Sequence, residues 1–167
     1  MPIILQSKNL NLREFTLADT AFIVELLKSE SWLEFIGDRN VKNEQDAENY
    51  LLNGPLKSYA ENGFGLALVE TKDDKTPIGM CGLIKRENLD HPDIGFAFLP
   101  VFMSKGYAFE ISKALMIFAR KKLKLNKILA ITDPKNKASI KLLEKLDFEF
   151  EKKIHFEEEE LFLFENV

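Results

Sequence analysis

The spacing of apolar and polar residues along the chain predicts alternating strands and helices. Segments with period-two alternation or short apolar runs are expected to be strands, and they cover residues 10–15, 64–71, 77–86, 93–99, 127–132, 148–153 and 160–164. Helical spacing of apolar residues predicts helices after the Thr16 cap, over 44–61 with a break at Gly54-Pro55, over 108–123 and over 136–146. Thr16 and Asp19 have the spacing of a capping box. Residues 29–39 are expected to be irregular.

The element order is β-α-α-β-β-β-α-β-α-β-β, which predicts an α/β fold. We expect a mixed sheet with helices on both faces, in a single domain over residues 1–167, because no repeat, linker or low-complexity tract interrupts the order. Residues 93–132 form a strand–helix–strand unit and are expected to make a right-handed parallel crossover. Ligands in such sheets usually bind at the C-terminal ends of strands, so the site is expected where strand 93–99 ends.

A short polar turn, residues 103–108, follows that strand and opens the next helix. Such a turn gathers unpaired backbone N–H groups at the positive end of the helix dipole, which suits an anion such as phosphate. Gly106 allows a ligand to approach the backbone closely, and Lys105 adds a positive charge. A plain strand-to-helix connection is the alternative for this segment taken alone.

Composition excludes several other classes of protein. The 167 residues carry a net charge of −4 with the two signs interspersed, so no nucleic-acid partner is expected. Cys81 is the only cysteine, and His91 and His155 have no partner at metal-ligand spacing, so neither a disulfide nor a metal site is expected. No signal peptide or membrane-spanning run is evident, which favours a cytoplasmic protein without a membrane partner.

The turn resembles the acetyl-CoA pyrophosphate loop of the GCN5-related N-acetyltransferases (GNATs). The loop motif, Gln/Arg-x-x-Gly-x-Gly/Ala, matches Met103, Gly106 and Ala108, and Met103 departs from it because its side chain has no donor. A second segment resembles the Asn-x-x-Ser…Glu-Lys-x-Gly-Phe signature of the branch that contains ribosomal-protein alanine N-acetyltransferases. It matches at Asn136 and Ser139, and Asp147 stands where the family has glycine. Asp tolerates left-handed backbone angles, so the turn after this helix is expected to survive.

The resemblance implies an enzyme that moves an acetyl group from acetyl-CoA directly to a primary amine, without a metal. The acceptor is either a protein N-terminus or a small amine, and the protein is a monomer or a homodimer. The alternative is a non-catalytic CoA-binding or interaction module with the same fold. The residues that the resemblance assigns to the cofactor are Phe98, Leu99, Ser104, Lys105, Gly106, Tyr107, Ala108 and Asn136.

The same resemblance suggests catalytic and acceptor-binding residues. A backbone N–H within 96–99 is expected to polarise the thioester carbonyl, and the Ser139 hydroxyl to stabilise the departing thiolate. Asp93 is the candidate general base acting through water, with a structural role at the strand edge as an equal alternative. Asn136 could equally be only a helix cap. The candidate acceptor-binding residues are Trp32, Glu34 and Arg39; Trp32 could instead be a core residue, and Arg39 could pair with a substrate carboxylate or with Asp38.

Overall fold

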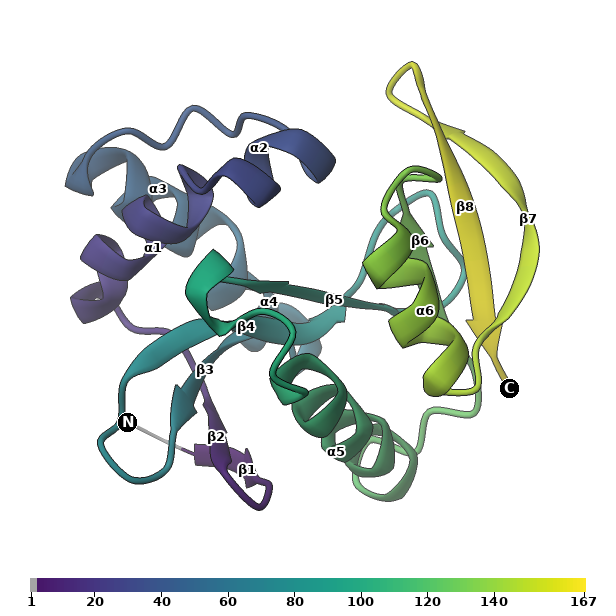
Figure 1. The fold of residues 1–167 in the computed structure, drawn as a ribbon, viewed down its shortest axis with the longest axis horizontal. Coiled ribbons are helices and arrows are strands. Elements are labelled where there is room, and N and C mark those ends of the chain that lie inside the picture. The colour runs from purple at the N-terminus through teal and green to yellow at the C-terminus, as the bar shows by residue number, and fades with distance from the viewer. Residues whose placement is uncertain (1–2) are drawn as a thin grey trace.

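The computed structural model describes residues 3–167, which form an eight-stranded sheet with helices on both faces (Figure 1). The strands are β1 (Ile3–Gln6), β2 (Leu10–Arg13), β3 (Leu66–Thr71), β4 (Pro77–Ile84), β5 (Asp93–Phe98), β6 (Ile128–Thr132), β7 (Glu149–Phe156) and β8 (Glu159–Asn166). Their order across the sheet is β1-β2-β3-β4-β5-β6-β8-β7. Within the described residues every neighbouring pair is antiparallel except β5 and β6, which are parallel as predicted.

Helices cover the two faces of the sheet and enclose two apolar clusters. The helical elements are η1 (Leu17–Asp19), α1 (Thr20–Leu27), α2 (Glu30–Phe35), α3 (Glu44–Asn53), α4 (Pro55–Asn62), η2 (Pro100–Phe102), α5 (Tyr107–Lys121) and α6 (Lys137–Lys145). The adjacent β3 residues Leu68 and Val69 belong to opposite clusters, as period-two alternation requires. Leu68 joins the cluster of α1 and α3, and Val69 joins that of α5 and α6. The prediction of a mixed sheet with helices on both faces is therefore confirmed.

Three elements, β1, α2 and the short η2, were not predicted from the sequence. The β1 segment is a continuous apolar run without alternation, and it pairs with β2 through an irregular register at the sheet edge. The α2 helix lies inside the stretch that was expected to be irregular. It has six residues and buries only Trp32, so it gives no helical periodicity that a sequence pattern can detect. The break at Gly54-Pro55 occurs as predicted and separates α3 from α4.

The C-terminal hairpin is longer than the alternating pattern indicated. β7 is the edge strand, and most of its side chains are exposed on both faces, so alternation does not mark its full length. Glu157 and Glu158 form the turn with positive φ angles of 51° and 80°. The acidic run 157–160 is exposed, as expected for a solvated hairpin turn. Within residues 3–167 we find no helix with the length and apolar character needed to cross a membrane.

The parallel strands β5 and β6 meet at their first residues and then separate. Asp93 pairs with Leu129, and the Leu129 N–H donates to the Pro92 carbonyl at 2.9 Å. No further pair of this ladder occurs among the described residues, although β5 continues to Phe98 and β6 to Thr132. In Figure 1, α5 and α6 lie on the same face of the sheet. Beyond their one pair, β5 and β6 therefore form a wedge in which no ladder hydrogen bonds join the two described strands.

A buried ionic network joins the start of α1 to the sheet. The Arg13 guanidinium donates to Glu70 at 3.0 Å and to both carboxylate oxygens of Asp19 at 2.9 and 3.0 Å. These three residues are at most 7 % exposed. Asp19 also accepts from the Thr16 N–H at 2.8 Å, which confirms the predicted capping box. Asn11 completes the network through a bond to Glu70 at 3.0 Å.

Candidate functional site

The wedge leaves backbone donors of β5 without a partner in the sheet. The Leu99 N–H donates to the Ile78 carbonyl at 2.9 Å, and Ala97 pairs with Met80. Because hydrogen-bonding direction alternates along a strand, Phe96 and Phe98 direct their N–H groups away from β4 and toward the gap. Within residues 3–167 neither finds a strand partner there. Of the predicted donors in 96–99, Phe96 and Phe98 are available, whereas the Leu99 N–H is already used.

The turn before α5 has the backbone geometry of an anion-binding site. Gly106 has φ 83° and Ser104 has φ 62°, so two left-handed residues curve the chain just before the helix. No side chain caps α5, and among the described residues the N–H groups of Tyr107, Ala108 and Phe109 have no acceptor, whereas the Glu110 N–H donates to the Gly106 carbonyl at 3.0 Å. A Cβ added at Gly106 would meet nothing within 4 Å, so the space beside this backbone is open. Lys105 is exposed at the same turn.

Glu110 lies in the first turn of α5, where a carboxylate would oppose anion binding. Its side chain instead accepts hydrogen bonds from the Asn9 N–H at 2.8 Å, from Asn9 Nδ2 at 2.9 Å and from the Ser7 hydroxyl. Partial burial raises the pKa of Glu110, but the hydrogen bonds from Ser7 and Asn9 outweigh burial, so the pKa is below its ordinary value. This carboxylate is therefore bound to the β1–β2 turn and fixes the start of α5 to the sheet.

The second motif forms the two ends of α6. Asn136 Oδ1 accepts from the Ser139 N–H at 3.1 Å, so Asn136 has the capping role, while its Nδ2 donates to no other described residue. Ser139 is half-buried, and its hydroxyl bonds to no other residue within 3–167. At the other end, Asp147 has φ 66° and the Phe148 N–H bonds to the Leu143 carbonyl at 2.9 Å. The left-handed turn expected at Asp147 is therefore formed.

Asp93 begins β5, and the turn before α5 follows the other end of that strand. At roughly 3.3 Å per residue, that end at Leu99 is about 20 Å from Asp93. Its carboxylate is 1 % exposed and accepts from Arg86 Nε at 2.9 Å. Burial raises the pKa of Asp93, and the positive charge and hydrogen bond of Arg86 oppose that rise without cancelling it. The guanidinium of Arg86 also lies 5.4 Å from the centre of the Phe156 ring. Asp93 thus sits buried where β5 and β6 meet, paired with Arg86 and with a pKa above its ordinary value.

The three candidate acceptor-binding residues occupy different environments. Trp32 is 5 % exposed within the apolar cluster of α1 and α3, and its buried Nε1–H has no hydrogen-bond partner among the described residues. Glu34 and Arg39 are exposed. The structure therefore does not gather the three around one point, and Arg39 lines a hollow beside α3.

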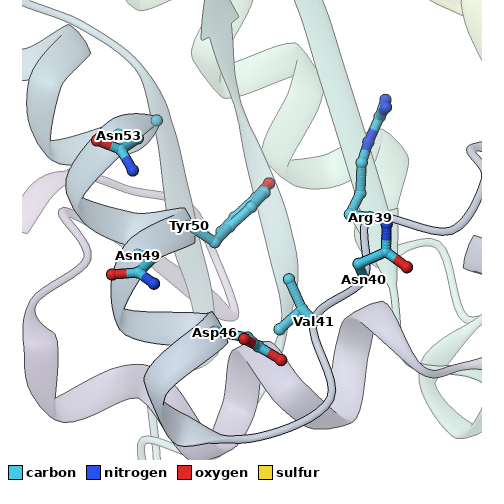
Figure 2. Close-up of a pocket in the computed structure, with 8 residues that line it drawn as sticks. Arg39, Asn40, Val41, Asp46, Asn49, Tyr50 and Asn53 are labelled. Atoms are coloured by element: carbon cyan, nitrogen blue, oxygen red, sulfur yellow. The ribbon is translucent and has the colours of Figure 1, made fainter.

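That hollow has a volume of about 380 Å³ and lies between α3 and the loop that precedes it (Figure 2). Its lining includes Arg39, Asp46, Asn49, Tyr50 and Asn53. A second hollow of about 290 Å³ shares Tyr50, Asn53 and Gly54 with it. Tyr50, Asn49 and Asn53 were not predicted as site residues from the sequence. The available signal was the run of polar side chains at three- and four-residue spacing in α3, which also fits an ordinary solvated helix face.

The comparison with protein families shows the family to which this chain belongs. A family model described as an acetyltransferase (GNAT) domain matches residues 9–149. The chain belongs to the GNAT family of acetyltransferases. The membership predicted from the turn and from the 136–148 motif is therefore confirmed.

Two proteins of Bacillus subtilis (strain 168) are similar to this GNAT chain. The uncharacterized protein YkkB is 33 % identical over 98 residues, which are 56 % of this chain and 57 % of YkkB. The uncharacterized N-acetyltransferase YnaD is 26 % identical over 140 residues, covering 84 % of this chain and 79 % of YnaD. YnaD is named as an N-acetyltransferase, and neither name states an acceptor.

Solved structures share the fold along the whole GNAT chain. An acetyltransferase from Agrobacterium tumefaciens str. C58 has a TM-score of 0.85 at 17 % identity and covers 100 % of this chain and 95 % of its own. RimL, a ribosomal L7/L12 α-N-protein acetyltransferase solved in complex with coenzyme A, has a TM-score of 0.86 at 16 % identity, with 99 % and 98 % covered. At this level of identity the likeness establishes the fold.

Proposed function

We propose that this GNAT chain transfers the acetyl group of acetyl-CoA to a primary amine. The observation that carries the proposal is the combination of the wedge between β5 and β6 with the uncapped, glycine-containing start of α5. The backbone N–H groups of 104–108 and the charge of Lys105 fit a pyrophosphate, and the open space beside Gly106 lets it approach. When bound, acetyl-CoA supplies an acetyl group held as a thioester.

Residues of the chain then act on the thioester carbonyl, on the departing thiolate, on the amine proton and on the cofactor. A free N–H of Phe96 or Phe98 lies at the gap to polarise a carbonyl, and fixed donors of this kind contribute about 3 kcal/mol in acyl transfer. The Ser139 hydroxyl, which has no other partner in the described residues, donates a hydrogen bond to the departing thiolate. Asp93 accepts the amine proton through water. Asn136 keeps Nδ2 free for the cofactor while Oδ1 caps α6.

The alternative, a non-catalytic CoA-binding or interaction module, rests on the two departures from the family motifs. Asp147 weakens the case for that alternative, because its left-handed turn is formed. Met103 still favours the non-catalytic module, because its side chain offers no hydrogen-bond donor to a phosphate. This side chain is 40 % exposed beside the turn. The free backbone N–H groups beside Met103 are what the enzyme proposal relies on instead.

Calorimetric titration with acetyl-CoA, with acetate and ATP as controls, tests the proposal first. Binding near 1 μM, or about −8 kcal/mol, with no binding of the two controls is the expected result. An amine and peptide panel, followed by thiol release, then identifies the acceptor as a small amine or a protein N-terminus. Binding of acetyl-CoA without turnover on any amine would favour the CoA-binding module, and no binding at all would overturn the enzyme proposal and favour the interaction module.

Ser139→Ala is expected to lower kcat about tenfold, because one hydrogen bond to a developing charge is worth roughly 1.5 kcal/mol. The alanine keeps the backbone N–H that Asn136 accepts from, so the cap and the affinity for acetyl-CoA should be unchanged. Steady-state kinetics and calorimetry measure the two quantities. Ser139→Thr, which retains a hydroxyl, is the matched control. Wild-type kcat in the alanine variant would remove Ser139 from the reaction.

Asp93→Asn is expected to abolish the acidic limb of the kcat/KM pH profile. In the wild type, activity falls as pH drops through the Asp93 pKa, because the base must be deprotonated, and burial places that pKa above the ordinary carboxyl value. Arg86→Gln removes the opposing positive charge, so it should move the same limb to higher pH. If neither substitution changes the profile, Asp93 has the structural role at the strand edge.

A further inference from the structure

The hollow beside α3 contains an arginine without a carboxylate partner. Arg39 makes no ion pair among residues 3–167, although Asp38 precedes it in the chain. The Asp38 carboxylate accepts from the Asn40 N–H at 2.7 Å instead. Asp46, the acid that lines the same hollow, accepts from the Lys42 N–H at 3.1 Å. Arg39 is exposed, so its guanidinium is available to an anionic group from outside the protein.

Tyr50 supplies a second donor to the same space. It lines both hollows, and in Figure 2 it lies between Asn49 and Asn53 on one side and Arg39 on the other. Burial raises the pKa of Tyr50 to about 12, with the charges of Arg39 and Arg86 opposing the rise, so the hydroxyl is protonated at neutral pH. It donates to no other described residue.

Charge and size restrict the ligand further. The second hollow is lined by two lysines and one acid, Lys57, Lys85 and Glu61. Basic side chains therefore outnumber acidic ones in the linings of the two hollows taken together. A volume of about 380 Å³ is near the small end for small-molecule sites, and a planar guanidinium matches a carboxylate through two parallel bonds. Ile84 lines the second hollow and pairs with Asp93 across β4 and β5, so that lining reaches the strand end where the candidate base lies.

We infer that Arg39 and Tyr50 bind the carboxylate of the acetyl acceptor, and that this acceptor is a small amino carboxylate. The inference rests on the proposed function and assigns its substrate class. Arg39 and Tyr50 act on affinity and orientation, so they are expected to affect KM for carboxylate-bearing amines. The amine of such a molecule extends toward the end of β5 where Asp93 lies.

The test uses pairs of acceptors that differ only at the carboxylate. A set of free L-amino acids and their carboxamides is assayed by thiol release with the intact enzyme and saturating acetyl-CoA. For the best pair, kcat/KM for the acid should exceed that for the amide at least about tenfold, the value of one charged hydrogen-bond pair of about 1.5 kcal/mol. Arg39→Gln should raise KM for the acid by a similar factor and leave the amide unchanged. Lys42→Gln, in the same loop but outside the lining of either hollow, is the matched control.

The outcomes separate this inference from the proposed function. If acetyl-CoA binds and amides are acetylated as well as acids, the carboxylate site is overturned while the acetyltransferase stands. Equal loss on acid and amide in Arg39→Gln also overturns it, because a merely structural effect would not discriminate between them. Turnover of peptide N-termini with none of the small acids would overturn the acceptor class. If acetyl-CoA does not bind, the proposed function itself fails.

Discussion

Gly106→Val is expected to weaken acetyl-CoA binding more than about a hundredfold, or over roughly 2.7 kcal/mol. Two effects act together. Gly106 has φ 83°, which a β-branched residue adopts only with strain, so the turn itself must change. The space beside its Cα is open in the protein, so a side chain would occupy the volume that a phosphate must enter. Calorimetry with acetyl-CoA measures the loss, and circular dichroism checks that the fold is retained.

Gly63→Val is the matched control for the strain. Gly63 ends α4 with φ 78°, and a Cβ there also meets nothing within 4 Å. The two substitutions therefore impose similar backbone strain in similarly open space, but Gly63 is not part of the turn before α5. Gly63→Val should lose stability to a similar extent and bind acetyl-CoA as the wild type does. Equal affinities in the two valine variants would show that the turn does not hold the cofactor.

Arg13→Met is expected to lower the free energy of unfolding by about 3–5 kcal/mol, as when one partner of a buried ion pair is removed. The methionine fills most of the side-chain volume, but it leaves Asp19 and Glu70 as buried carboxylates without a counter-charge. Since Asp19 also caps the turn that begins the helical layer, the loss should affect the whole domain. Urea unfolding, followed by circular dichroism, gives the difference.

A second substitution identifies the cause of that loss. Glu70→Gln, added to Arg13→Met, removes one of the two unpaired buried carboxylates. The double variant should therefore be more stable than Arg13→Met alone. Lys153→Met, which breaks an exposed pair with Glu160 at 3.8 Å, is the surface control and should have little effect. If Arg13→Met costs no more than Lys153→Met, the network does not contribute as described.

Features set by neighbouring residues were predictable from the sequence. The capping box at Thr16, the break at Gly54-Pro55 and the left-handed turn at Asp147 each depend on a few adjacent positions, and each is formed. The β1 strand and the α2 helix were missed because tertiary packing, rather than their own periodicity, defines them. The turn before α5 was likewise visible, since a glycine between a strand and a helix is a local pattern.

Features that depend on packing between distant segments were not predictable. No pattern in 93–99 shows that the Leu99 N–H donates to β4, or that the N–H groups of Phe96 and Phe98 point away from it. The burial of Asp93 under Arg86 depends on the path of the loop after β4. The hollow at Tyr50 exists because a loop passes over α3, so its lining combines residues that no motif connects.

The single pair between β5 and β6 also has a consequence for motion. The two halves of the sheet are continuous ladders on either side, but only Asp93 and Leu129 join them within the described backbone. Such a seam can pivot at low energetic cost, because few hydrogen bonds must break for the halves to open. A molecule that bonds to both β5 and α6 closes the seam, and its binding free energy adds directly to the stability of the fold. We therefore expect acetyl-CoA, bound in the proposed site, to stiffen the protein in the same step in which it is loaded.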